Sequence, residues 1–240
     1  MPAAAGRAEV AGAAGTPCAR VSGAGRAAVS GPGKEGAWRA GLDGSTAVFA
    51  TTPAGRPRVT GRLARTDAPW LMVIARPHAA DGRCWLEVRL PWRPNDAAGW
   101  IDADRVFLAQ TRWRIGISTS RRTLTLFRDG EPVRTVSVVV GKPSTPTPTG
   151  LFAVAWAIRW KPNDFLGSWV LELTAHSDVL RRFDGGDGTV GIHGRGGSSL
   201  LDPLGSAASH GCIRLANAAI DWLVRTVGSD QLPGTPVRIS

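Results

Sequence analysis

The residues best suited to chemistry lie in two short segments near the end of the chain. The first reads Gly191-Ile192-His193-Gly194 and the second reads Ser209-His210-Gly211-Cys212-Ile213-Arg214-Leu215. A cysteine attacks as its thiolate, so a neighbouring base or cation must lower its pKa below that of a free thiol. His193, nineteen residues before Cys212, can supply that base. The separation is too long for one helix face, but it suits a strand-end histidine that meets a loop cysteine.

The residues around Cys212 add the other groups that acyl transfer requires. When a thiolate attacks a carbonyl, negative charge develops on the oxygen, and backbone N–H groups stabilise it. We expect His210, Gly211 and Cys212 to offer theirs, since glycine lets the loop turn without a side-chain clash. Ser209 either hydrogen-bonds within the loop or reaches the catalytic histidine. Arg214 either meets a substrate carboxylate or pairs with a nearby acid.

The spaced motif resembles a known enzyme signature. His-Gly, a spacer of fourteen residues (195–208) and then Ser-His-Gly-Cys-Ile-Arg is similar to the signature of the YkuD-type L,D-transpeptidases, which crosslink bacterial peptidoglycan. Residues 141–152 (GKPSTPTPTGLF) resemble the Pro-Thr-Pro-x-Gly-x-Phe segment of that family, and residues 234–239 (GTPVRI) resemble its closing strand. The resemblance covers about residues 112–240.

This resemblance implies a site, a reaction and a location. Cys212 is the expected nucleophile and His193 the expected base, oriented by the carbonyl of Gly194. The implied reaction releases the terminal D-alanine of a peptidoglycan stem peptide and joins the acyl group to another stem, without a cofactor or a metal. Such a protein is extracytoplasmic, in the cell wall or periplasm. An L,D-carboxypeptidase that uses the same thioester and a non-enzymatic cell-wall-binding protein remain as alternatives.

Composition narrows the possible partners. The net charge of +10 and a pI near 11.2 favour anionic partners. However, the basic residues are scattered, and no zinc-finger, helix-turn-helix or RNA-binding signature accompanies them, so nucleic acid is not expected. No apolar run is long enough to predict a transmembrane helix. The first residues lack a positively charged start followed by an apolar stretch, so they predict no secretory signal.

The three cysteines are few and widely spaced. Cys18, Cys84 and Cys212 form no Cys-x-x-Cys pair and predict no disulfide framework. Cys212 and His210 are too close together for the usual spacing of zinc ligands, so no metal site is expected. We interpret Cys18 as an incidental exposed thiol and Cys84 as a small buried hydrophobic residue.

The first half of the chain divides into two predicted regions. Residues 1–42 are rich in Ala and Gly and predict a disordered segment, because they offer few side chains to bury. Residues 43–110 predict an accessory domain in which short apolar runs alternate with turn residues. Five strands are expected, at 46–50, 59–63, 70–74, 84–90 and from 99 onwards. Their number and their ending, Leu90-Pro91-Trp92-Arg93-Pro94-Asn95 before Gly99-Trp100-Ile101, resemble bacterial SH3-type barrels.

Residues 111–240 predict the catalytic domain, an L,D-transpeptidase-type β-sandwich with one helix. Strands are expected at 114–118, 123–127, 132–140, 151–158, 169–173 and 235–239. Residues 160–168 interrupt the pattern and form either a flap over the site or an ordinary surface hairpin. His176 is expected to be exposed in a loop. Asn217 is expected to cap a helix whose apolar positions, beginning at Ile220, recur with helical spacing. The predicted fold class is therefore mainly β.

Overall fold

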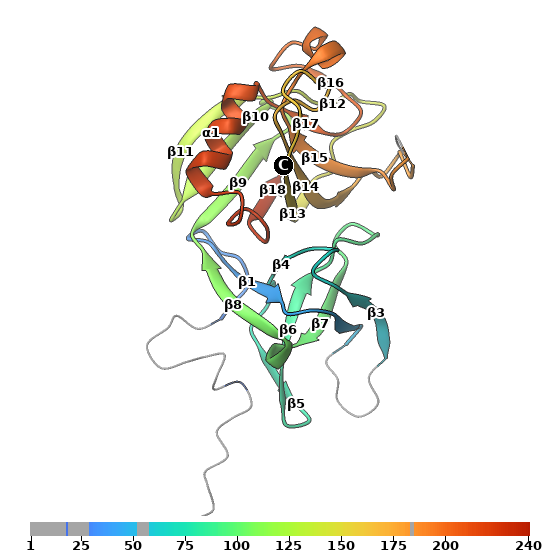
Figure 1. Ribbon diagram of the computed structural model, residues 1–240, viewed down its shortest axis with the longest axis vertical. Coiled ribbons are helices and arrows are strands. Elements are labelled where there is room, and N and C mark those ends of the chain that lie inside the picture. Colours follow the sequence, from blue (N-terminus) through green and yellow to red (C-terminus); the bar gives the residue numbers. More distant parts are fainter. Residues whose placement is uncertain (1–17, 19–28, 52–57, 183–184) are drawn as a thin grey trace, which may run out of the picture.

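The computed structural model describes Cys18 and residues 29–51, 58–182 and 185–240 of the 240-residue chain. Figure 1 shows two units stacked one above the other, the lower one drawn in blue to green and the upper one in green to red. Within the described residues the regular structure is β-strand, apart from one α-helix and two short 3₁₀ helices. The predicted mainly β class with one helix is confirmed.

The lower, N-terminal unit contains two sheets. Its elements are β1 (Ala37–Leu42), β2 (Thr46–Phe49), β3 (Val59–Leu63), β4 (Trp70–Met72), β5 (His78–Ala80), β6 (Arg83–Arg89), β7 (Ala98–Asp102), the 3₁₀ helix η1 (Ala103–Arg105) and β8 (Val106–Thr111). One sheet has the order β4-β1-β8 and the other β3-β2-β7-β6-β5. In β6, Leu86 and Val88 lie in the core of this unit while Glu87 is half-buried on the other face, as alternation predicts.

The segment predicted to be disordered lies largely outside the described residues. Besides Cys18, its described part is 29–42, which includes β1, a strand that the sequence analysis did not predict. This strand pairs with both β4 and β8, and all six of its residues are buried. Its sequence, AWRAGL, contains Gly and two Ala, which are poor strand formers, so pairing with two neighbours decides its conformation. The N-terminal unit therefore begins before residue 43.

The expectations for Cys18 and Cys84 were wrong in one respect. The two residues form a disulfide, with their Cα atoms 4.9 Å apart and a sequence separation of 66. Cys84 is buried in the core of the N-terminal unit, on the face where the alternation of β6 placed it. Burial could be read from the strand pattern, whereas a partner so distant in sequence could not.

The upper, catalytic unit contains an eight-stranded sheet of order β11-β10-β9-β18-β13-β14-β15-β17. Its elements are β9 (Trp113–Ser118), β10 (Thr123–Arg128), β11 (Glu131–Ser137), β12 (Val140–Gly141), β13 (Gly150–Arg159), β14 (Trp169–His176), β15 (Thr189–His193), the 3₁₀ helix η2 (Gly197–Leu201), β16 (Ala207–Ser209), β17 (Ile213–Arg214), α1 (Asn217–Val227) and β18 (Pro236–Ile239). The strand predicted over 132–140 is divided into β11 and β12. Strand β18 runs parallel to β9 and antiparallel to β13, and so joins the two halves of the sheet.

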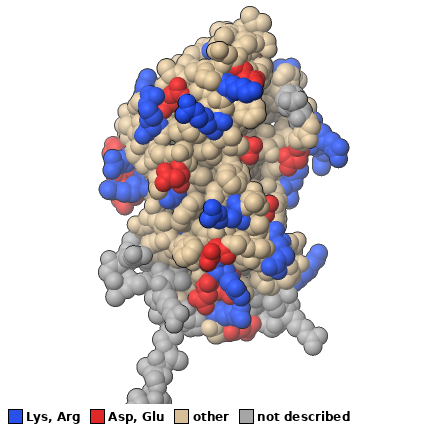
Figure 2. All heavy atoms as spheres, viewed as in Figure 1, with Lys and Arg blue, Asp and Glu red and all other residues tan. Residues whose placement is uncertain are grey.

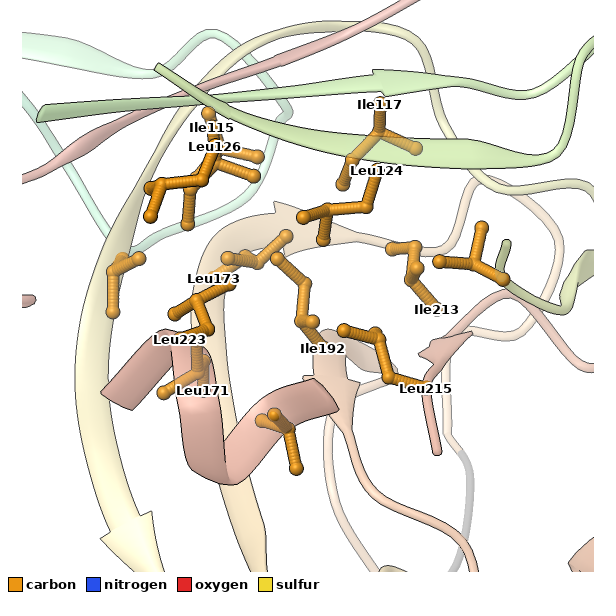
Figure 3. Packing of buried hydrophobic residues seen from close by; sticks show 14 of the residues in the cluster. Ile115, Ile117, Leu124, Leu126, Leu171, Leu173, Ile192, Ile213, Leu215 and Leu223 are labelled. Carbon is orange, nitrogen blue, oxygen red and sulfur yellow. The ribbon is translucent and has the colours of Figure 1, made fainter. Parts of the chain in front are cut away.

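Helix α1 packs on this sheet through one apolar face. Ile220, Leu223, Val224 and Val227 are buried, at the spacing that the sequence predicted. Figure 3 shows Leu223 of α1 beside Leu171 and Leu173 of β14. Burying one such leucine contributes about 1.5–3 kcal/mol.

The start of α1 differs from the prediction. Its N-cap residue is Ala216, which makes no capping hydrogen bond through its side chain, and Asn217 is the first helical residue. The side chain of Asn217 faces the loops beside the predicted site, where it takes another role described below.

The two units contact each other through specific hydrogen bonds. Arg39 of β1 is almost fully buried, and its guanidinium donates to the backbone oxygens of Gln231, at 2.8 Å, and Pro233, at 2.9 Å.

Figure 2 shows Lys and Arg side chains dispersed among Asp and Glu on the visible face, without one large basic patch. No helix among the described residues has the length and apolar content needed to cross a membrane.

Candidate active site

Strands β15 and β17 bring the two predicted motif segments together. They pair in parallel, with Ile192 opposite Ile213, so His193 ends one strand while Cys212 immediately precedes the other. Both residues line one cavity of about 370 Å³. The backbone N–H of Gly191 donates to the Cys212 Sγ at 3.5 Å, a contact that the sequence analysis did not anticipate.

His193 is buried, and a hydrogen bond to the next residue orients its ring. Its Nδ1 lies 2.8 Å from the carbonyl oxygen of Gly194, the acceptor that the family resemblance implied. Donation from Nδ1 leaves Nε2 as the proton acceptor of a neutral ring. Burial lowers the pKa of His193 to about 4, with a further decrease from the Arg214 charge, against the opposing effect of its backbone hydrogen bonds. The imidazole is therefore neutral near pH 7.

Cys212 differs from the thiolate that the sequence analysis expected. Burial raises the pKa of its thiol, and the Gly191 hydrogen bond and the Arg214 charge only partly oppose this increase. No hydrogen bond joins Cys212 to His193 in this arrangement. The resting site thus holds a neutral thiol and a neutral imidazole in one cavity, which suits proton transfer during attack more than a preformed ion pair.

The nucleophile loop, residues 209–212, is closed by Ser209. Its Oγ donates to the Cys212 carbonyl at 2.6 Å and accepts from the Gly211 N–H at 3.1 Å. Ser209 therefore bonds within the loop, one of the two alternatives predicted for it. Gly211 has φ +125°, a conformation that L side chains rarely adopt. The sequence analysis expected the Gly211 N–H to donate to an oxyanion, but in this structure it already donates to Ser209.

Two threonines of the proline-rich segment support this loop from outside. Thr147 Oγ1 donates to the Gly211 carbonyl at 2.8 Å and accepts from the Gly141 N–H at 2.8 Å. Thr145 Oγ1 donates to the Ser209 carbonyl at 3.3 Å. The sequence analysis treated this segment only as part of the family resemblance. The threonines that alternate with its prolines were the available signal for a supporting role.

The two remaining predicted site residues, Arg214 and His210, differ in burial and in their contacts. Arg214 is buried, forms an ion pair with Asp202 and lies 4.7 Å from the ring centroid of Phe165. Its guanidinium is thus already paired with an acid, the second alternative predicted for it, although the residue still lines the cavity. His210 is exposed, and its Nε2 lies 3.3 Å from Lys142 Nζ.

Residues 160–168, called the flap below after one of the two predicted alternatives, line part of the cavity. Trp160 and Phe165 line it, and the Phe165 ring centroid lies 6.2 Å from that of His193. The Phe165 carbonyl accepts a hydrogen bond from Ser199 Oγ at 2.9 Å. The segment predicted as either a flap or an ordinary surface hairpin therefore borders the site. The hydrogen bond from Ser199 holds its tip.

Asn217 fastens the base of the flap to the segment that follows His193. Its Oδ1 accepts from the N–H groups of Arg195, at 2.9 Å, and Ser168, at 3.2 Å, while its Nδ2 donates to the Pro162 carbonyl at 3.0 Å. A Cβ atom on Gly194 would lie 2.1 Å from Asn217 Oδ1, so a larger residue there would displace the Asn217 side chain. Sequence reasoning missed this role because an asparagine at a helix start also satisfies a capping pattern.

A further wall of the cavity comes from the end of β14 and the segment after it. Ser177, Leu180, Gly188 and Thr189 line the cavity on this side. His176, expected to be exposed, is instead buried, and its Nε2 lies 3.0 Å from Asp187 Oδ2. Burial lowers the pKa of His176, while Asp187 opposes the decrease. Among the described residues, no three His, Cys, Asp or Glu side chains gather as a metal site.

Comparison with known proteins identifies the family of the chain. The profile of the YkuD family, described as an L,D-transpeptidase catalytic domain, matches residues 112–239. A Bacillus licheniformis protein named as an L,D-transpeptidase, YkuD, is 33% identical over 171 residues, which cover 68% of this chain and 90% of that protein. Its Bacillus subtilis namesake is 30% identical over 128 residues, which cover 53% of this chain and 66% of that protein.

Solved structures include similar chains. A crystal structure of an Enterococcus faecium L,D-transpeptidase variant matches with a TM-score of 0.37 and 22% identity. The match covers 53% of this chain and 49% of that one, so the chain spans about half the length of that structure.

Proposed function

The chain belongs to the YkuD family of L,D-transpeptidase catalytic domains, which are cysteine-dependent acyltransferases, and on this premise we propose a specific reaction for it. The protein crosslinks peptidoglycan stem peptides through a thioester on Cys212, with His193 as the general base and acid. The observation that carries the proposal is the placement of both residues on one cavity by adjacent strands.

The first half of the reaction forms the thioester. Cys212 Sγ attacks the carbonyl carbon of the donor peptide while its proton passes to His193 Nε2, the ring nitrogen that does not face Gly194. The C–N bond then breaks, and the departing amine of D-alanine takes that proton. A neutral thiol and a neutral imidazole suit this order of steps, because each proton moves within the site and none is required from solvent.

The oxyanion formed during attack needs donors. Because Ser209 already accepts from the Gly211 N–H, the backbone N–H groups of Cys212 and His210 are the better candidates in this arrangement. A single such donor contributes about 3 kcal/mol to transition-state stabilisation in other acyl-transfer enzymes. Ser209 and Thr147 contribute by fixing the carbonyls of the same loop, which holds its N–H groups in place.

The second half transfers the acyl group to an amine of another stem peptide. His193 accepts the proton of the attacking amine, the new C–N bond forms, and the Cys212 thiolate leaves and is reprotonated. Attack by water would instead release a shortened peptide, the carboxypeptidase outcome. Both outcomes share one thioester, and access of the acceptor amine to the cavity separates them.

Two further assignments accompany this reaction. We assign residues 111–240 to the catalytic domain and the described residues from 29 to 110 to an accessory domain with an SH3-like fold. We also place the protein outside the cytoplasmic membrane. The Cys18–Cys84 disulfide supports that location, because disulfides form and persist in oxidising compartments.

The test uses purified tetrapeptide stems and a carbapenem. Wild-type protein is expected to give crosslinked dimers and free D-alanine, and to gain the mass of one carbapenem; Cys212→Ala is expected to do neither while keeping the wild-type melting temperature. Shortened peptide without dimer would replace transpeptidation with carboxypeptidation. Equal behaviour of the two proteins would overturn the enzymatic proposal and favour wall binding.

A further inference from the structure

The wall segment, defined as residues 177–182 and 185–189, borders the cavity beside the end of β14. Within the segment, the Ser177 N–H donates to the Gly188 carbonyl at 2.8 Å, and Ser177 Oγ accepts from the Leu180 N–H at 3.0 Å. Many of its remaining polar contacts go to the loop between β6 and β7, in the N-terminal unit. The shape of this wall therefore depends on residues outside the catalytic unit.

Arg93, in that loop, joins both ends of the wall segment. Its guanidinium donates to the carbonyls of Ser177 at 3.0 Å, Leu180 at 3.2 Å and Asp187 at 2.7 Å. A guanidinium presents its donors in a rigid planar fork, so one side chain can fix three carbonyls relative to one another. Two of these three carbonyls belong to Ser177 and Leu180, which line the cavity.

Asn95, two residues further on, fixes the point where the wall segment leaves β14. Its Nδ2 donates to the His176 carbonyl at 2.8 Å, and its Oδ1 accepts from the His176 N–H at 2.8 Å. This two-way pairing matches the pattern of neighbouring residues in an antiparallel sheet. The same Nδ2 also lies 3.0 Å from Asp178 Oδ1.

The close approach of Arg93 depends on a glycine. Gly188 has φ +78°, and a Cβ atom there would lie 2.0 Å from the Leu180 carbonyl oxygen and 2.9 Å from Arg93 Nη2. Next to it, the Asp187 carboxylate accepts from Thr189 Oγ1 at 2.5 Å and bonds to the buried His176 ring. The Arg93 guanidinium thus lies against a backbone that leaves no room for a side chain at residue 188.

We propose that Arg93 and Asn95 are positioning residues for acyl transfer, through which the N-terminal unit completes one wall of the substrate cavity. The inference rests on the proposed function, because it assigns the wall segment to the binding of the peptide donor. The N-terminal unit then acts on catalysis directly, by shaping the cavity, in addition to any ligand that it binds itself.

The experiment compares Arg93→Ala and Asn95→Ala with wild type in the full chain. We expect kcat/KM for the tetrapeptide donor to fall about ten- to one hundredfold, mainly through KM, because a displaced wall misplaces the peptide. Alkylation of Cys212 by iodoacetamide, a reagent too small to need the wall, is expected to change less than about twofold. Arg93→Lys, which keeps the charge without the planar fork, is expected to fall between wild type and alanine.

Trp156→Phe is the matched control. It removes another hydrogen bond between the units, from Trp156 Nε1 to the Asp67 carbonyl at 3.0 Å, but Trp156 does not line the cavity. This variant is expected to keep the wild-type kcat/KM. A loss equal to that of Arg93→Ala would show that general contact between the units matters, and would overturn the specific assignment.

Amide hydrogen exchange separates this inference from the proposed function. In Arg93→Ala we expect faster exchange at residues 177–182 and 185–189, while the nucleophile loop keeps its protection. Unchanged exchange in that segment, or unchanged kcat/KM in both alanine variants, would overturn the inference. If wild type transfers no acyl group, the proposed function fails, whereas the exchange data still decide whether Arg93 holds the wall.

Discussion

The nucleophile loop and the wall segment border the same cavity, but their supporting hydrogen bonds come from different parts of the chain. Ser209 and Thr147, both in the catalytic unit, close the nucleophile loop. The wall segment instead receives Arg93 and Asn95 from the N-terminal unit. Chemistry at Cys212 is thus local to one unit, while the shape offered to a substrate depends on both. Changes in the two regions should therefore alter different measured quantities.

The largest effect is expected from His193→Gln, which removes the base and leaves both walls in place. Acyl transfer is expected to fall by at least about 10³-fold, equivalent to about 4 kcal/mol, because the amide of glutamine cannot take the thiol proton as the imidazole does. Steady-state kinetics with the tetrapeptide measures the change. His78→Gln, at an exposed histidine of the N-terminal unit, is the control and should retain full activity. A loss of less than tenfold in His193→Gln would contradict the role assigned to the imidazole.

Reduction of the Cys18–Cys84 disulfide tests the unit that supports the wall segment. Opening a crosslink across 66 residues is expected to lower the free energy of unfolding by about 4 kcal/mol, through the greater chain entropy of the unfolded state. Guanidinium unfolding of wild type with and without dithiothreitol measures this, with Cys84→Ala as a variant that dithiothreitol should leave unchanged. If the reduced protein stays folded, the KM for the tetrapeptide should rise by a larger factor than the factor by which alkylation of Cys212 slows. A larger effect on alkylation than on KM would show that the nucleophile loop also depends on the N-terminal unit.

The pH dependence of stability tests the burial of His193. Its pKa falls from an ordinary value of 6.5 to about 4 on folding, so the unfolded chain binds more protons between these values. The free energy of unfolding should therefore decrease as pH falls from about 6.5 to 4, by roughly 3 kcal/mol from this residue. Urea unfolding of wild type and His193→Gln across this range gives the contribution by difference. Parallel curves for the two proteins would show that His193 titrates normally.

The smallest effect is expected from Thr147→Val, which keeps the shape of a buried side chain and removes its hydroxyl. The Gly211 carbonyl and the Gly141 N–H each lose a partner, so the free energy of unfolding should fall by about 2 kcal/mol. Activity should fall as well, because the carbonyl lies in the nucleophile loop. Thr135→Val, at an exposed threonine bonded to Thr125, is the matched control and should cost less than about 0.5 kcal/mol. Equal losses in the two variants would remove the special role of Thr147.

The sequence predicted best those features that repeat locally or form a motif. Alternation in β6 placed Cys84 on a buried face, and the apolar spacing of α1 gave its packing side. The spaced motif gave Cys212 and His193, which the structure places on one cavity. These features could be recognised because each depends on residue types a few positions apart.

Features that depend on distant contacts were missed or misread. Strand β1 contains poor strand formers and exists because it pairs on both sides. Cys18 pairs with a cysteine 66 positions away. Asn217 fits a capping pattern, but its hydrogen bonds go to the flap. Arg93 entered the prediction only through the resemblance of its segment to SH3-type barrels, because the three carbonyls that it binds are more than 80 residues further along.

The position of β18 also constrains the order in which the catalytic unit can fold. Pro236–Ile239 lies between β9 and β13 and comes later in the sequence than the other seven strands of this sheet. Until these four residues leave the ribosome, the edges of β9 and β13 have no partner between them, and unpaired edges are prone to join other chains. The two halves of the eight-stranded sheet can therefore join only after β18 has been synthesised.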